Sequence, residues 1–124
     1  MFRLTFLADL VTLATPTWAD DLPTAISCYE TATNSQNIEA YLACFTDDAV
    51  MIDVNREFVG HDAIRAWAER EVMPGGQSFK HLQILKYEDG YAKTEVNWAF
   101  LVVHYHYWWN GEGKITKMSL QYAD

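Results

Sequence analysis

The segment of residues 29–65 constrains the fold most strongly, because it alternates between helical and extended patterns within a short distance. A second short helical pattern covers residues 38–45, an apolar strand follows at residues 50–53, and Gly60 opens a third helix. The strand ends in Asp53, and such a lone carboxylate is either a base in a pocket or a residue that faces water. The first helix is predicted by residues at helical spacing: Ala25, Ile26, Tyr29, Ala32 and Thr33.

The rest of the chain has the pattern of a sheet. The third helix ends at Met73, where Pro74 and Gly75 follow, and the remaining sequence alternates at strand spacing. We expect strands over residues 79–87, 91–100, 101–109 and 115–122, with hairpin turns at residues 88–90 and 110–113. Helices followed by antiparallel strands are typical of an α+β fold. A curved antiparallel sheet with about three helices on its concave side would leave a hollow that suits a small ligand.

Length and charge exclude several classes of protein. A chain of 124 residues is long enough for one domain with a single core. Its net charge is −8, with nine basic residues scattered among seventeen acidic ones. That distribution provides no basic face for phosphate groups, so we expect no nucleic-acid partner, and an anionic membrane surface is disfavoured.

Residues 1–19 form a separate segment, with Arg3 near the start, an apolar run over residues 4–13 and small residues up to Ala19. This order resembles a secretory signal peptide, although Asp9 interrupts the run. A retained N-terminal arm is the alternative, and the run is too short to span a bilayer. We therefore expect one domain over residues 20–124, periplasmic or secreted if residues 1–19 are a signal peptide and cytoplasmic otherwise.

The two cysteines, Cys28 and Cys44, fall within predicted helices. No basic residue flanks either one and there is no Cys-x-x-Cys spacing, so neither is expected to be a reactive thiol. Free, mostly buried thiols are the expectation. An exported protein could join them, but a disulfide depends on a distance that sequence spacing does not give.

The run Ala-Tyr-Leu-Ala-Cys-Phe-Thr-Asp-Asp-Ala-Val at residues 40–50 resembles the SnoaL-like and ketosteroid isomerase-like branch of the nuclear transport factor 2-like superfamily. The similarity covers residues 25–64 and resumes from the Asn-Gly-Glu-Gly-Lys turn at residues 110–114 to Tyr122. The resemblance implies a cone-shaped α+β fold, often assembled as a homodimer. Because this fold carries isomerases, cyclases, dehydratases and non-enzymes, it identifies a shape better than a reaction.

The resemblance also implies roles for individual residues. Asp53 matches the aspartate that moves a proton in the isomerases, and Tyr29 matches the tyrosine that donates to the developing oxyanion. Tyr105 stands where the isomerases have a second donor, a protonated aspartate, and a tyrosine can also donate. Ala68 replaces a supporting tyrosine, so the chain of hydroxyls behind Tyr29 is expected to be incomplete. No cofactor is implied.

Side chains on the inner face are the expected lining for a small apolar molecule, with structural core as the competing role for each. The family has a hairpin loop between its two long strands, but residues 97–102 contain no Gly, Pro or Asp. The turn near Ala99 is therefore either very tight or displaced. The candidate lining residues are Met51, Trp67, Trp98, Tyr107, Met118, Leu120 and Tyr122.

His104, His106 and Trp108 alternate onto the opposite face of their strand. We expect this outer face to be buried in a homodimer, since exposed apolar surface of that extent would be a liability. Two histidines could bind a metal, but no third His or Cys is indicated nearby, so no metal site is expected.

The expected function is that of a SnoaL-like pocket protein, in the form of a cofactor-independent isomerase or cyclase that acts on a small apolar carbonyl compound. The alternative is a non-catalytic ligand-binding or dimerisation module. The aspartate and histidine pair of polyketide cyclases is not matched, because His104 and His106 have no acidic residue on the last strand. Epoxide hydrolases of this fold use two carboxylates bridged by an arginine, and the sequence offers only Asp53 with Arg56 or Arg65.

Overall fold

The structure is a computed structural model that describes residues 22–98 and 100–123. The predicted signal peptide or arm, residues 1–19, lies outside the described residues. Within the described part of the chain, no helix has the length and apolar character needed to cross a membrane. The elements are α1 (Thr24–Asn34), α2 (Ile38–Ala43), β1 (Phe45–Asp53), β2 (Arg56–Val59), α3 (Gly60–Glu71), the 3-10 helix η3 (Met73–Ser78), β3 (His81–Glu88), β4 (Tyr91–Trp98), β5 (Leu101–Trp109) and β6 (Ile115–Tyr122).

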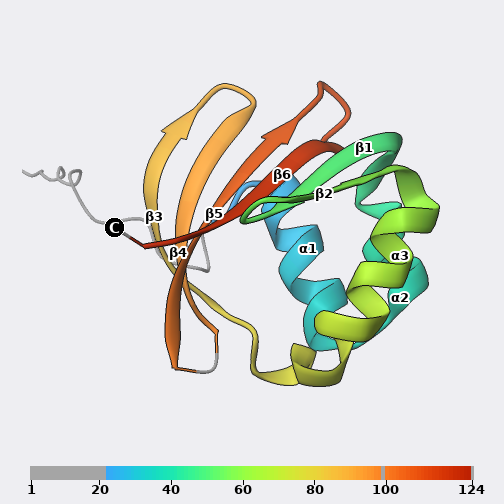
Figure 1. Cartoon of the computed structure of the whole chain (residues 1–124). Coiled ribbons are helices and arrows are strands. Elements are labelled where there is room, and N and C mark those ends of the chain that lie inside the picture. The colour runs from blue at the N-terminus through green and yellow to red at the C-terminus, as the bar shows by residue number, and fades with distance from the viewer. Residues whose placement is uncertain (1–21, 99, 124) are drawn as a thin grey trace, which may run out of the picture.

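The six strands form one curved sheet in the order β2-β1-β6-β5-β4-β3. The helices gather on the inner side of its curve (Figure 1). The predicted α+β class, with a curved sheet and helices on the concave side, is confirmed. The sheet differs from a wholly antiparallel one because β1 and β6 run parallel. Parallel strands end at the same edge of a sheet, so Asp53 at the end of β1 lies beside Leu120 near the end of β6.

The second helix is shorter than predicted. Asn37 caps its start by accepting a hydrogen bond from the Ala40 backbone N–H at 3.0 Å, and the helix ends at Ala43. Phe45 is therefore the first residue of β1, where it pairs with Ile115 and is buried. Pairing with β6 therefore decides the conformation of Phe45, although its sequence spacing suits a helix. A register shift between Phe45 and Val50 accommodates the residues between them.

Cys28 and Cys44 form a disulfide, so the expectation of free thiols is wrong. Cys28 lies in α1 and Cys44 directly follows α2, and packing between the two helices brings their Cα atoms to 5.9 Å. That distance is within the range that a disulfide can bridge. The crosslink fixes the helix pair that carries Tyr29.

The turn between β4 and β5 was predicted to be either very tight or displaced, and it is very tight. Trp98 and Leu101 pair directly across the turn, so the strands are joined by a two-residue connection. Phe100 lies in that connection and its side chain is 94% exposed. The two strands thus continue to the end of the sheet as one long hairpin.

The core lies between the helices and the inner face of the sheet. The predicted inner face of α1 is confirmed, since all of its members are buried: Ala25, Ile26, Tyr29, Ala32 and Thr33. Trp67 of α3 and Tyr107 of β5 are among the largest fully buried side chains. The aromatic content of the chain therefore fills the centre of the cone and leaves an opening at the end where β1 and β6 stop.

Candidate functional site

A cavity of about 390 Å³ opens at the end of the cone. Its walls are the turn between β1 and β2, the C-terminal part of α3, the β4–β5 hairpin and the end of β6. Residues predicted for a site that lie on these walls are Asp53, Tyr105, Trp67, Trp98, Leu120 and Tyr122. The volume is within the usual range for pockets that hold small molecules.

Asp53 and Tyr105 belong to one row of the sheet. Asp53 on β1 pairs with Leu120 on β6, and Leu120 pairs in turn with Tyr105 on β5. Residues paired across neighbouring strands project from the same face, and two strand spacings separate the first and third by about 10 Å. The carboxylate and the phenol therefore face one cavity from its two sides.

The Asp53 carboxylate is held by two donors. The Trp67 indole N–H donates to Oδ2 at 3.1 Å, and the Arg56 guanidinium forms an ion pair with the same oxygen. The Asp53 side chain is 18% exposed, so it is neither deeply buried nor freely solvated. Trp67 of α3 thus orients the carboxylate of Asp53 at the end of β1.

The turn that separates Asp53 from Arg56 is strained. Val54 has a φ of +60°, a conformation that a β-branched residue rarely adopts. Two hydrogen bonds hold this turn against β6: the Val54 N–H donates to the Leu120 carbonyl at 2.9 Å, and the Gln121 amide donates to the Val54 carbonyl at 3.2 Å. Strain of this kind persists only where the surrounding structure enforces it, which is common at functional sites.

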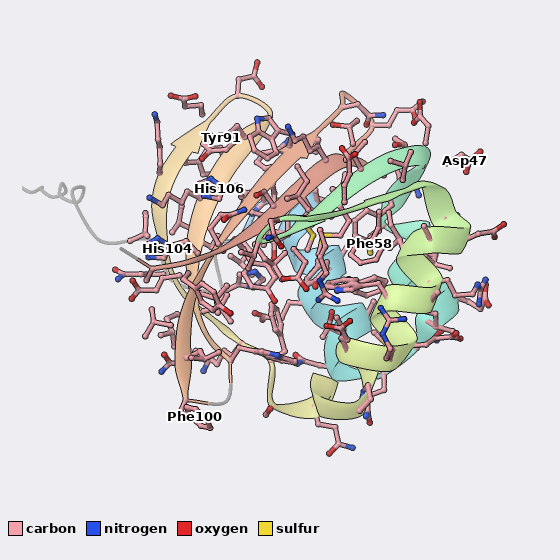
Figure 2. The ribbon with its side chains drawn as sticks, in the orientation of Figure 1. Asp47, Phe58, Tyr91, Phe100, His104 and His106 are labelled. Carbon is pink, nitrogen blue, oxygen red and sulfur yellow. A yellow bond between two sulfur atoms is a disulfide. The ribbon has the colours of Figure 1, made fainter. Side chains whose placement is uncertain are left out.

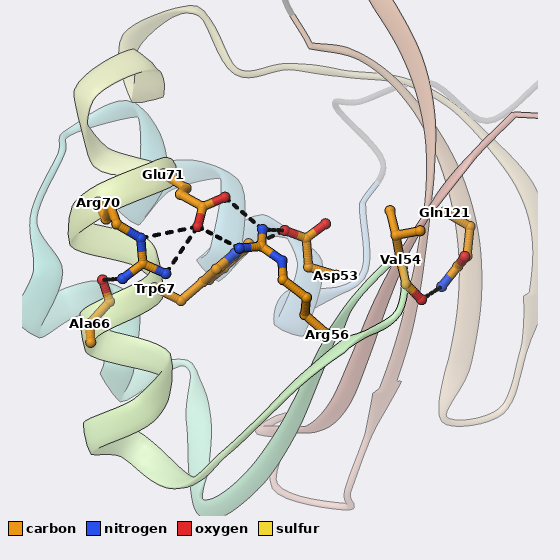
Figure 3. Close-up of polar contacts among 8 residues, drawn as sticks. All are labelled: Asp53, Val54, Arg56, Ala66, Trp67, Arg70, Glu71 and Gln121. Atoms are coloured by element: carbon orange, nitrogen blue, oxygen red, sulfur yellow. Dashed lines mark hydrogen bonds and ion pairs between the residues drawn. The ribbon is translucent and has the colours of Figure 1, made fainter.

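Arg56 bridges Asp53 to a second carboxylate, Glu71 (Figure 3). Its two terminal nitrogens donate to Glu71 at 2.9 and 2.7 Å, and Arg70 donates to the same carboxylate at 3.0 Å. The hydrogen bonds to Glu71 and then to Asp53 raise the pKa of Arg56, and the hydrogen bond from Arg56 lowers the pKa of Glu71.

Glu71 was not predicted from the sequence. The expectation that only Asp53 could pair with Arg56 or Arg65 is wrong, since Arg56 has Glu71 as a second partner and Arg65 pairs with Glu39 at 2.7 Å. The helical spacing of α3 could have indicated Glu71 as a site residue. Residues four apart lie on one face of a helix, and Glu71 follows the predicted lining residue Trp67 by that spacing.

Tyr105 presents its phenol to the cavity. Its side chain is buried, and burial raises its pKa, with the negative charge of Asp53 acting in the same direction. A hydrogen bond with Tyr29 opposes this rise without cancelling it. The phenol therefore keeps its proton over the ordinary pH range.

Tyr29 does not line the cavity but lies directly behind Tyr105 in the core. The Tyr29 hydroxyl accepts a hydrogen bond from that of Tyr41 at 3.1 Å, and the Tyr29 ring packs edge-on against Tyr105 with ring centroids 6.0 Å apart. The chain of hydroxyls behind Tyr29 is thus continued by Tyr41 of α2, although Ala68 lacks a hydroxyl as expected. Tyr41 stands within the 40–50 motif, but the motif did not indicate that its hydroxyl points inward.

The model of the SnoaL-like domain family matches residues 27–118, most of the sequence. The chain belongs to the SnoaL-like domain family. A comparison with curated proteins finds no match.

Solved structures share the fold of this SnoaL-like domain at low sequence identity. A candidate polyketide cyclase from Sinorhizobium meliloti matches with a TM-score of 0.70 at 20% identity, over 83% of this chain and 98% of that one. A SnoaL-like protein of unknown function from Burkholderia thailandensis matches with a TM-score of 0.68 at 13% identity, over 80% of this chain and 92% of that one. The Orange Carotenoid Protein of Anabaena, solved with canthaxanthin, matches with a TM-score of 0.61 at 18% identity, over 90% of this chain but 42% of that one.

The remaining predicted lining residues lie deeper in the SnoaL-like domain. Met51, Tyr107 and Met118 form a row across β1, β6 and β5 and are fully buried beneath the cavity. None of the three lines the cavity. Their row is two residues away from the row of Asp53 and Tyr105, so they support the cavity floor.

A second polar group, which the sequence did not reveal, lies in the core of the SnoaL-like domain. The buried His81 ring contacts a carboxylate oxygen of Glu30 at 2.7 Å through Nδ1 and the Tyr107 hydroxyl at 2.7 Å through Nε2. Burial alone would raise the pKa of Glu30, but the hydrogen bonds from His81 outweigh it and lower that pKa. Glu30 and His81 are 51 residues apart, so no local spacing predicts their contact.

The outer face of the sheet carries the histidines predicted for a homodimer interface (Figure 2). His106 accepts or donates a hydrogen bond with the Tyr91 hydroxyl at 2.7 Å and stacks on Trp108. His104 is 3.3 Å from a carboxylate oxygen of Glu95, which comes from β4. Among the residues that the structure describes, no cluster of three or more His, Cys, Asp or Glu side chains could hold a metal ion.

Proposed function

We propose that this SnoaL-like domain is a cofactor-independent enzyme that moves a proton on a small carbonyl compound, in an isomerisation or a cyclisation. Asp53 would be the base and Tyr105 the hydrogen-bond donor to the developing oxyanion. The observation that carries the proposal is that both groups face one cavity from the same row of the sheet. Proton removal next to a carbonyl needs a base on one side, a role that a carboxylate can fill, and is accelerated by a hydrogen-bond donor on the other.

Tyr29 enters this proposal as a supporting residue. Sequence reasoning gave Tyr29 and Tyr105 equal roles as donors, but Tyr29 is buried behind Tyr105. Its hydroxyl, together with that of Tyr41, would polarise and orient the Tyr105 phenol as negative charge develops on the substrate oxygen. Only Tyr105 would then contact the substrate.

Arg56 must leave Asp53 for the carboxylate to reach a substrate proton. Glu71 offers the alternative position, because it already accepts two hydrogen bonds from the guanidinium. In the proposed cycle the guanidinium stays with Glu71 while the substrate displaces it from Asp53. The Trp67 indole keeps the carboxylate oriented throughout.

The cyclisation arm of the proposal draws on the candidate polyketide cyclase from Sinorhizobium meliloti, which has this fold. At 20% identity that likeness concerns the fold alone, so the reaction class rests on the cavity residues. A cavity of about 390 Å³, with apolar and aromatic walls on one side and Asp53, Arg56 and Glu71 on the other, suits a compact substrate that carries a polar carbonyl group on an apolar body.

The test is turnover of a ketone that isomerises to a conjugated enone, followed by absorbance, in the parent protein and the Asp53→Asn variant. Asp48→Asn is the matched control, since Asp48 is an exposed aspartate on the same strand. We expect turnover to fall by at least about a hundredfold in Asp53→Asn and to stay unchanged in Asp48→Asn. Equal turnover in all three proteins would end the assignment, while ligand binding without turnover in any of them would favour a binding module.

Epoxide hydrolysis is a second candidate, favoured by the Asp53, Arg56 and Glu71 bridge. One carboxylate would take a proton from water as the oxygen attacks an epoxide carbon, and the other, protonated, would give its proton to the epoxide oxygen, which yields a diol. The substrate separates the two candidates. Conversion of an epoxide to a diol by the parent protein, lost in Glu71→Gln, would support the second, and turnover of the ketone without any diol formation would support the first.

A further inference from the structure

Exposed apolar side chains lie at the end of the β4–β5 hairpin and on the neighbouring β1–β2 turn and end of β6, and they are defined here as the tip patch: Val54, Phe100, Leu101, Val102 and Tyr122. Phe100 is 94% exposed and Tyr122 is 63% exposed, values that are unusual for side chains of this size. Figure 2 shows Phe100 at the far end of the hairpin, away from the helices. A hydrogen bond from the Ala123 N–H to the Val102 carbonyl at 3.1 Å joins the end of β6 to this hairpin.

The hairpin end is free of charge in a strongly acidic chain. Residues 96–103 contain no Asp, Glu, Lys or Arg, although the whole chain has a net charge of −8. Neither an anionic surface nor a basic protein patch finds a charged group to pair with here. A surface that takes up this segment must therefore be apolar and electrically neutral where it meets the tip.

The tip patch is continuous with the cavity. Val54, Leu101 and Tyr122 line the cavity as well as being exposed. Trp98, at the base of the hairpin, also lines it and is fixed by edge contact with Phe79, with ring centroids 5.5 Å apart. Whatever covers the tip patch thus also borders the cavity mouth.

The shape of the tip distinguishes between a second protein and a lipid phase. Successive residues of a strand project to opposite faces, so Leu101 and Val102 place apolar side chains on both faces of the hairpin. A stable protein interface uses about 20–30 residues on each side, far more than the five of the tip patch. A flat partner would also cover one face only, whereas acyl chains surround an inserted tip on all sides.

We propose that the β4–β5 hairpin tip inserts into the surface of a zwitterionic lipid layer and presents the cavity mouth to it. The cavity would then take its ligand, a neutral apolar small molecule, from the lipid phase without passage through water. The aromatic Phe100 and Tyr122 are residue types that settle at such an interface. The inference depends on the cavity and the tip patch and does not depend on the proton transfer assigned to Asp53.

The test is flotation of the full chain with phosphatidylcholine vesicles, for the parent protein, Phe100→Ser and Val59→Ser. Val59 is the matched control, since it is an apolar side chain with 58% exposure that does not line the cavity. We expect vesicle affinity to fall about tenfold or more in Phe100→Ser, as burial of one Phe side chain implies, and to stay unchanged in Val59→Ser. All proteins share residues 1–21, so a contribution of that segment would be equal in each.

Vesicle binding that is absent in the parent protein, or equal in the parent and Phe100→Ser, would overturn the proposal. A change of native mass in Phe100→Ser would also overturn it, in favour of a second copy of the chain at the tip. Brominated lipids provide an independent measurement, because insertion should quench Trp98 fluorescence, a signal that Trp98→Phe should remove. Asp53→Asn should bind vesicles like the parent, which separates failure of this proposal from failure of the proposed reaction.

Discussion

Asp53 on β1 and Tyr105 on β5 pair with the same residue of β6, Leu120, one on each side. This arrangement depends on the parallel pairing of β1 and β6, which brings the end of β1 to the end of the sheet where the cavity opens. The backbones of the two residues are two strand spacings apart, about 10 Å, and both side chains line the cavity where a small carbonyl compound would lie.

Tyr105→Phe should reduce turnover strongly while leaving ligand affinity nearly unchanged. Removal of one oxyanion donor typically costs about a hundredfold to a thousandfold in rate, because the donor acts on charge that exists only in the transition state. Steady-state kinetics should therefore show the loss in kcat and little change in KM. Tyr87→Phe, which alters an exposed tyrosine, is the control. A loss confined to KM would assign Tyr105 to binding.

Tyr41→Phe should have a smaller effect of the same kind. Tyr41 acts through Tyr29, whose hydroxyl is 3.1 Å away, and one hydrogen bond between neutral groups contributes about 1 kcal/mol. We expect the free energy of unfolding to fall by about that amount and kcat to fall by no more than about tenfold. Urea unfolding and kinetics on one preparation measure both. An unchanged stability would show that the Tyr41 hydroxyl is not part of the chain.

The fold could be predicted from the sequence because its signals are local. The spacing of Ala25, Ile26 and Tyr29 gave the buried face of α1, and the turn residues of the β3–β4 and β5–β6 hairpins gave their strands. The family motif at residues 40–50 supplied the shape. The start of β1 at Phe45 was not predicted, because the spacing of Phe45 matches the preceding helix. Its strand conformation depends on pairing with Ile115, which is 70 residues away in the chain.

The candidate site could be predicted only in part, because its polar contacts join distant segments. Asp53 and Tyr105 were named as residues, but the position of Tyr29 behind Tyr105 depends on how α1 packs against the sheet. Glu71 meets Arg56 across the gap between α3 and the β1–β2 turn. The disulfide likewise depends on the packing of α1 against α2, which residue spacing does not determine.

Loss of the Cys28–Cys44 disulfide should destabilise the protein by about 3 kcal/mol, as expected for a closed loop of about 15 residues. Chemical denaturation with and without a reductant measures this difference directly. The Cys28→Ala/Cys44→Ala double variant is the control, since its stability should not respond to the reductant. Because such bonds persist in oxidising compartments, we expect the native protein to carry it when isolated from the periplasm or the medium. A reductant that leaves the parent protein equally stable would contradict the prediction.

Glu30 should contribute stability that is lost in acid. Its pKa in the folded protein lies below the ordinary value of 4.5, because the hydrogen bonds from His81 favour the carboxylate. The contribution is therefore complete above pH 4.5 and disappears as the pH falls through the lower, folded-state pKa. Unfolding measured from pH 6 to pH 3 should show a shallower decline in Glu30→Gln than in the parent. Glu112→Gln, which alters an exposed glutamate, should follow the parent curve.

Deuterium exchange measures the proton removal assigned to Asp53 without requiring that the natural substrate be known. A small cyclic ketone is incubated with the protein in heavy water, and incorporation of deuterium next to the carbonyl is followed by NMR. We expect the parent protein and Asp48→Asn to accelerate the exchange, and Asp53→Asn to leave it at the uncatalysed rate. Exchange that proceeds equally with Asp53→Asn and the parent would contradict that assignment.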